Sequence, residues 1–109
     1  MAKTAAYVQR GEALDYKNGS EEMIPAWTVV LIGNRIGVAG CDIPAGAVGT
    51  VHVTGVFEIP KKASVELRAG DDVTFTDADG IDKATSDAVG YAVEDAAEAA
   101  ATAKVKLLV

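Results

Sequence analysis

Residues 50–60 read TVHVTGVFEIP, and they form the clearest strand pattern in this sequence. Large apolar residues alternate with polar ones, and one side of the pattern consists of Val51, Val53, Phe57 and Ile59. This period of two residues is typical of a half-buried β-strand. Pro60 ends the pattern, because proline has no N–H group to donate to a strand ladder. We therefore predict a central strand over residues 50–60.

The segments on either side of this stretch look like two versions of one unit. Residues 24–32 align with residues 67–75, and residues 37–39 align with residues 90–92. Each version has a turn, a strand, a hairpin and a return strand that begins with glycine. Short strands at roughly ten-residue spacing favour a small sandwich or barrel. We predict a mainly all-β fold, a small β-sandwich or barrel built of two pseudo-repeated hairpin units around the central strand.

Two segments give weaker signals. Residues 94–102 (EDAAEAAAT) are rich in alanine and glutamate, which are strong helix formers, but nine residues alone are marginal as a helix in water. We expect at most one or two short helical turns there, or an exposed loop. Residues 5–9 are a candidate short strand. The length of 109 residues predicts a single domain, residues 1–109, with a flexible N-terminal arm at about residues 1–8.

Charge and composition exclude several classes of protein. The chain has 10 basic and 16 acidic residues, and its net charge of -6 would repel nucleic acid in the absence of a basic stripe. No apolar run approaches the roughly 18 residues that span a membrane. The first residues lack an apolar segment, so we do not expect a signal peptide. A single cysteine, Cys41, leaves no intrachain disulfide.

No catalytic constellation is visible. His52 is the only histidine, and it lies on the polar side of the predicted central strand, where we expect it to be solvated. No serine lies on a nucleophile elbow. One histidine and one cysteine are too few for a transition-metal site. We predict a protein that is not an enzyme and has no cofactor and no metal.

The carboxylates of residues 77–82 (DADGID) loosely look like a calcium loop. The twelve-residue calcium loop ends in glutamate, but position 12 counted from Asp77 is Ala88. Asp-Gly is a strong hairpin signal, so we interpret this segment as a turn.

Trp27 is the only tryptophan and lies just before a predicted strand. It could belong to the core or be an exposed contact residue. Because aromatic side chains are favoured at interfaces, Trp27 is the first choice for a contact with another subunit or partner.

A series of glycine-and-strand motifs runs along the chain: YVQRGE (7–12), LDY (14–16), VVL (29–31), GVA (37–39), DIPAG (42–46), GTVHV (49–53), GVFEIPK (55–61), GDDV (70–73) and GYAVE (90–94). Together they resemble a family of small phage and prophage head proteins, the capsid cement or head decoration proteins, over essentially the whole chain. These motifs carry no catalytic signature. Trp27 departs from the family pattern, which tends to have glycine there, as the second unit has at Gly70.

The resemblance implies a β-rich, non-enzymatic protein, made in the host cytoplasm, that binds the outer surface of the expanded icosahedral capsid. Its partners would be the major capsid protein and, in a homotrimer, further copies of itself; nucleic acid and membranes are not expected. It would stabilise contacts between major capsid protein subunits, and the N-terminal arm could add a strand to a capsid sheet edge. The candidate contact residues are Tyr7, Val8, Trp27, Lys61 and Lys62.

The alternative from a different class is a small carbohydrate- or ligand-binding β-barrel, such as an adhesin-like surface module. That function requires an exposed aromatic cleft around Trp27, Tyr91 and Tyr16. An enzyme would require a pocket that joins His52 to carboxylates.

Overall fold

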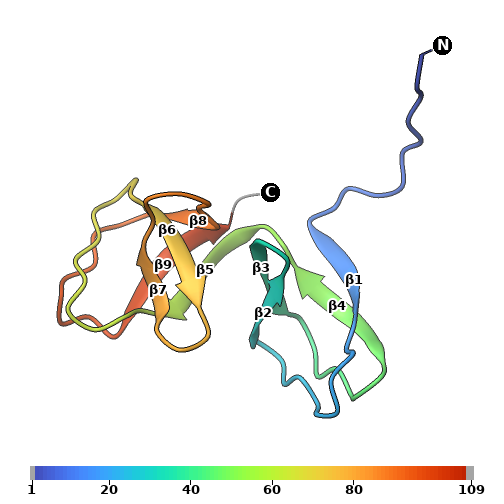
Figure 1. The fold of residues 1–109 in the computed structure, drawn as a ribbon, viewed down its shortest axis with the longest axis horizontal. Coiled ribbons are helices and arrows are strands. Elements are labelled where there is room, and N and C mark those ends of the chain that lie inside the picture. Colours follow the sequence, from blue (N-terminus) through green and yellow to red (C-terminus); the bar gives the residue numbers. More distant parts are fainter. Residues whose placement is uncertain (1, 108–109) are drawn as a thin grey trace.

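The computed structural model describes residues 2–107, and this range contains nine β-strands and no helix (Figure 1). The prediction of an all-β fold is therefore confirmed. The strands are β1 (Ala13–Lys17), β2 (Val29–Ile32), β3 (Arg35–Ala39), β4 (Val48–His52), β5 (Gly55–Pro60), β6 (Asp72–Thr76), β7 (Gly80–Lys83), β8 (Gly90–Ala92) and β9 (Thr102–Leu107).

The strands form two antiparallel sheets, one for each predicted unit. The first sheet has the order β1-β4-β3-β2, and the second has the order β5-β9-β8-β6-β7. In these orders, β5, β9, β8 and β6 of the second sheet are equivalent to β1, β4, β3 and β2 of the first. β7 is an additional strand at the edge of the second sheet. The pseudo-repeat predicted from the sequence is thus confirmed, and the two sheets are consistent with a small β-sandwich.

The turns of the two units match in their hydrogen bonds as well. An isolated antiparallel bridge joins Ile24 to Ile43 in the first unit, and another joins Leu67 to Ala96 in the second. In each unit a tight turn follows the first residue of this bridge, and a backbone hydrogen bond closes it. The Thr28 N–H donates to the Pro25 carbonyl at 3.2 Å, and the Asp71 N–H donates to the Arg68 carbonyl at 2.9 Å.

The predicted central strand over residues 50–60 is wrong, because this stretch is two strands in different sheets. β4 pairs with β1 and β3, whereas β5 pairs with β9. Gly55 begins β5 with a φ of 118°, a conformation that favours glycine and redirects the chain. The alternation of apolar and polar residues continues across the break, so it gave no sign that the chain changes sheets.

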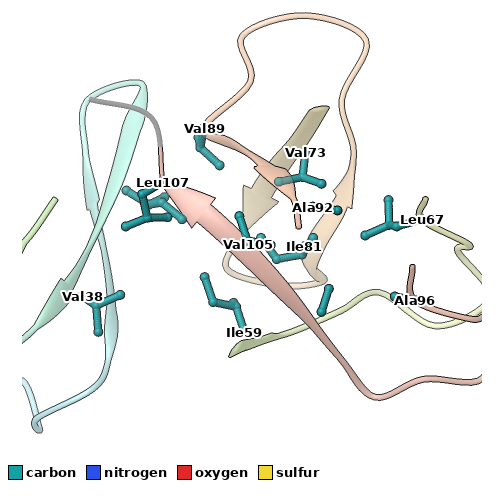
Figure 2. Packing of buried hydrophobic residues seen from close by; sticks show 12 residues of the cluster. Val38, Ile59, Leu67, Val73, Ile81, Val89, Ala92, Ala96, Val105 and Leu107 are labelled. Atoms are coloured by element: carbon teal, nitrogen blue, oxygen red, sulfur yellow. The ribbon is translucent and has the colours of Figure 1, made fainter. Parts of the chain in front are cut away.

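The hydrophobic core joins the two sheets. Ile36 and Val38 of β3 belong to the same buried cluster as Ile59, Val105 and Leu107 of the second sheet (Figure 2). A smaller cluster, Val30, Ala39, Ile43 and Val51, lies on the other face of the first sheet. Since β3 contributes to both clusters, it is the strand that connects the packing of the two units.

Two further predictions concern segments outside the sheets. Residues 5–9 form no strand; residues 2–10 are exposed and lack regular secondary structure. Residues 94–101 contain a single bridge at Ala96 and a turn, and Thr102 begins β9, so the loop alternative is the correct one. Within residues 2–107, no helix is long and apolar enough to cross a membrane.

Candidate interaction surface

A groove lies between the two units, and we call it the inter-unit groove. It has a volume of about 380 Å³. Residues 27–29 line it from the first unit, and Pro60, Phe75 and residues 77–80 line it from the second. The turn of the β6–β7 hairpin forms one wall, and β7 is the strand of the second unit that has no counterpart in the first.

Three aromatic rings lie where the two units meet. The rings of Trp27 and His52 are stacked, with centroids 6.4 Å apart and an angle of 19° between their planes. The rings of His52 and Phe57 are 6.2 Å apart and tilted by 33°. Because Phe57 lies in β5 and His52 in β4, this stack connects the first sheet to the second.

The Trp27 side chain is 68% exposed, so it is an accessible residue and not part of the core. The backbone N–H of Trp27 donates to the Ala39 carbonyl at 2.7 Å, which fixes the turn against the end of β3. Its φ of 71° lies in the left-handed region that favours glycine. Gly46 and Gly70 take up similar values, 77° and 93°, in the corresponding turns. The first unit therefore holds a large aromatic ring at a position whose backbone suits glycine.

His52 differs from its prediction as a solvated strand histidine. It is half-buried between Trp27 and Phe57, because its side chain lies on the side of β4 that faces the junction of the units. Among the residues that the structure describes, no group of three or more His, Cys, Asp or Glu side chains is placed to hold a metal ion.

The other predicted contact residues fall into two groups. Tyr7 and Val8, on the N-terminal arm, are 82% and 85% exposed. Lys62 is exposed as well, and its Nζ lies 3.8 Å from Oδ2 of Asp82.

Lys61 is only 7% exposed, so it does not belong to the accessible surface. Its Nζ donates to the carbonyl oxygens of Lys62 at 3.0 Å, of Val65, and of Glu98 at 3.4 Å. A surface position had been expected for Lys61 because its side chain is charged. Main-chain carbonyls of the surrounding loops accept hydrogen bonds from the ammonium group instead.

Residues 77–82 form the turn and the first part of the return strand of the β6–β7 hairpin, as the turn interpretation predicted. The Asp79 N–H donates to Oγ1 of Thr76 at 3.2 Å, which closes the turn. The role of this turn as a wall of the inter-unit groove was missed by the sequence analysis. The ten-residue insertion relative to the first unit was the signal that could have drawn attention to it.

The aromatic cleft required by the carbohydrate-binding alternative is not formed as predicted. Trp27 lines the inter-unit groove together with Phe75, but neither Tyr16 nor Tyr91 lines it. Both tyrosines are half-buried within their own sheets.

With this geometry in place, the comparison with protein families is decisive. The family model described as phage cement protein matches residues 8–107. The chain belongs to the phage cement protein family. This cement protein is thus a structural component associated with a phage capsid, and its family is not known for enzymatic activity. No match was found among curated proteins or among solved structures.

Proposed function

We propose that this cement protein binds the outer surface of the expanded icosahedral capsid and stabilises the contacts between major capsid protein subunits. The family match over residues 8–107 is the observation that carries the proposal. The net charge of -6 supports a position on the outside of the shell, away from the packaged nucleic acid.

The stabilisation would follow from mass action. A protein that binds the assembled shell, but not its separated subunits, stabilises the shell by about 2.7 kcal/mol per site at a hundredfold excess over Kd. Many sites on one particle would together oppose the internal pressure of the packaged genome. No chemical step is needed, which agrees with a structural protein family.

The N-terminal arm and Trp27 are the surface features best suited to such contacts. Tyr7 and Val8 are among the most exposed apolar side chains of the described chain, and contiguous exposed apolar residues mark interaction sites. An extended arm could add a strand to a sheet edge of the major capsid protein, or it could contact a neighbouring copy in the same assembly. Lys62 remains a candidate for the rim of the contact.

We further propose that three copies associate around local three-fold positions of the shell. A homotrimer would place three copies of the protein over the seams between neighbouring capsid subunits. Multiple linked contacts raise the effective affinity without any change in the individual contacts.

The test is co-sedimentation of the purified protein with expanded capsids that lack cement protein, followed by a heat challenge of the shells. We expect binding close to one copy per major capsid protein and a higher temperature of disruption. Unexpanded shells serve as the control and should bind much less. Absence of binding to expanded capsids would refute the proposal.

A further inference from the structure

We propose that the inter-unit groove of one copy binds the N-terminal arm, residues 2–10, of a second copy. This inference rests on the self-association included in the proposed function and deepens it, because it assigns the two surfaces that meet. The occupant of the groove is thus a segment of this chain itself, which reaches it from a neighbouring molecule.

The arm has the properties of a ligand segment. Residues 2–10 are exposed and form no strand or turn. Figure 1 shows the arm leading away from both sheets. Lys3 and Arg10 are its charged residues, so the arm is basic although the chain as a whole is acidic. Arg10 pairs with Glu12 at 3.1 Å, so Lys3 is the cation of the arm that is offered to the groove. Tyr7 and Val8 add two exposed apolar side chains between these charges.

The groove complements this composition. Trp27, Pro60 and Phe75 provide an apolar wall, and Asp77 and Asp79 provide carboxylates at the hairpin turn. Neither of these two carboxylates takes part in a salt bridge within residues 2–107. An aromatic side chain packed in a groove with a charged pair at its rim is a typical arrangement for the strong contacts of an interface.

The backbone of Trp27 supports the same conclusion. A φ of 71° is unfavourable for a residue with a side chain. The equivalent Gly70 shows that the turn forms without a side chain at this position. A strained residue persists where its side chain has a role. Here the ring forms the wall of the groove and remains 68% exposed, which leaves a face free for a partner.

The order of strands favours a second copy over the arm of the same chain. The arm precedes β1, which is one edge of the first sheet. The groove lies beyond β2, the opposite edge of that sheet, and its far wall belongs to the second sheet. Nine extended residues span about 30 Å, enough to reach a neighbouring molecule. Such a head-to-tail contact gives a closed ring when the rotation between copies closes.

The experiment uses disulfide trapping between two differently labelled populations of the full chain. Both carry Cys41→Ser; one carries Ala6→Cys next to the arm's Tyr7, and the other carries Ala78→Cys at the groove. We expect oxidation of the mixture to give a cross-linked species that contains one chain of each kind. The same trapping is repeated on expanded capsids.

Two variants of the groove population make the result specific. Trp27→Gly removes the ring while its backbone conformation suits glycine, and circular dichroism verifies that it folds. We expect at least a tenfold lower yield of cross-link, the loss that corresponds to one contact residue worth roughly 1.4 kcal/mol. Val48→Ser alters a residue of similar exposure, 62%, outside the groove and should leave the yield unchanged.

Each outcome decides the proposal. A third sample, one chain with both Ala6→Cys and Ala78→Cys, tests the arm of the same copy. A cross-link that forms within this chain, but not between the two single-cysteine populations, would overturn the proposal. No cross-link, free or on capsids, would overturn it altogether, as would equal yields with Trp27→Gly and Val48→Ser. Trapping between copies without any binding to capsids would uphold this inference and refute the proposed function.

Discussion

Asn18 in the first unit and Lys61 in the second occupy equivalent positions, and each is a buried polar residue whose side chain donates to main-chain carbonyls. Their own backbones are held alike. The Asn18 N–H donates to the Ala47 carbonyl at 2.8 Å, and the Lys61 N–H donates to the Ala101 carbonyl at 2.9 Å. Two chemically different side chains therefore serve one structural purpose.

That purpose is to hold the loop that leads to the next turn. Nδ2 of Asn18 donates to the carbonyls of Glu22 at 2.7 Å and Ile43 at 2.9 Å. The ammonium of Lys61 reaches the carbonyls of Val65 and Glu98 in the same manner. Because buried carbonyls without donors destabilise a fold, the interior selects a donor at this position.

Replacement of Lys61 by methionine tests this role. Methionine fills most of the volume but offers no donor, so the interior carbonyls of the loop lose their partner. We expect the free energy of unfolding to fall by about 1–3 kcal/mol. Urea unfolding followed by circular dichroism would measure it.

Lys62→Met is the matched control, because the two lysines are neighbours in sequence and only one is buried. The ion pair of Lys62 with Asp82 is partly exposed, and such pairs contribute at most about 1 kcal/mol to the free energy of unfolding. A similar loss of stability in both variants would show that the carbonyl contacts of Lys61 do not matter.

The equivalence of Trp27 and Gly70 gives a second prediction. Trp27→Gly relieves a backbone strain of about 1–2 kcal/mol and removes an aromatic stack worth about 0.5–1.5 kcal/mol. These effects nearly cancel, so we expect the free energy of unfolding to change by less than about 1 kcal/mol.

Gly70→Ala is the converse change. A Cβ atom at Gly70 meets nothing within 4 Å, so its effect comes from the backbone, whose φ is 93°. We expect a loss of about 1 kcal/mol, measured as a lower midpoint of thermal unfolding. An unchanged midpoint would mean that these turns tolerate side chains freely, and the strain assigned to Trp27 would be wrong.

Asp42 and Asp95 form the third matched pair. Oδ1 of Asp42 accepts the Ala26 N–H at 2.8 Å, and Oδ1 of Asp95 accepts the Ala69 N–H at 2.8 Å. We expect alanine at either position to lower the free energy of unfolding by about 1 kcal/mol. Asparagine keeps the acceptor oxygen and should cost less than half of that. If alanine and asparagine had the same effect, the charge of the aspartate, and not its hydrogen bond, would be the stabilising factor.

The sequence predicted the features of this fold that depend on local pattern. Alternating residues gave the strands, and the similarity of residues 24–32 to residues 67–75 gave the two units. The break near Gly55 was not predicted, because the alternation of apolar and polar residues continues from β4 into β5. The burial of Lys61 was not predicted, because a charged side chain normally lies at the surface and the equivalent Asn18 lies in an equally polar segment.

The candidate interaction surface was predictable only in part. Exposure of Tyr7 and Val8 agrees with the predicted N-terminal arm, whereas the candidate strand over residues 5–9 is absent. The position of Trp27 next to Phe75 depends on how the two sheets pack, and no pattern within a single strand contains that information. The residues of a surface that both units share can therefore be identified only from the structure.

The last prediction concerns the proposal that residues 1–109 form a single domain. Ile36 belongs to the first sheet but is 3% exposed within the cluster of the second sheet. Removing most of its side chain should therefore weaken both units at once. We expect Ile36→Ala to lower the free energy of unfolding by about 2–5 kcal/mol and to preserve a single cooperative transition. Calorimetry combined with urea unfolding of the wild type and the variant would measure both quantities.

Val48→Ala serves as the control, because Val48 is exposed on the first sheet and should change the stability by no more than about 0.5 kcal/mol. Two separate transitions in the wild type would contradict the single domain and would mean that the units fold independently. One transition that shifts with Ile36→Ala would instead show that β3 couples them, because a residue of one sheet would then determine the stability of the other. Coupled units keep the two walls of the inter-unit groove in a fixed relation, which a stable contact with a partner requires.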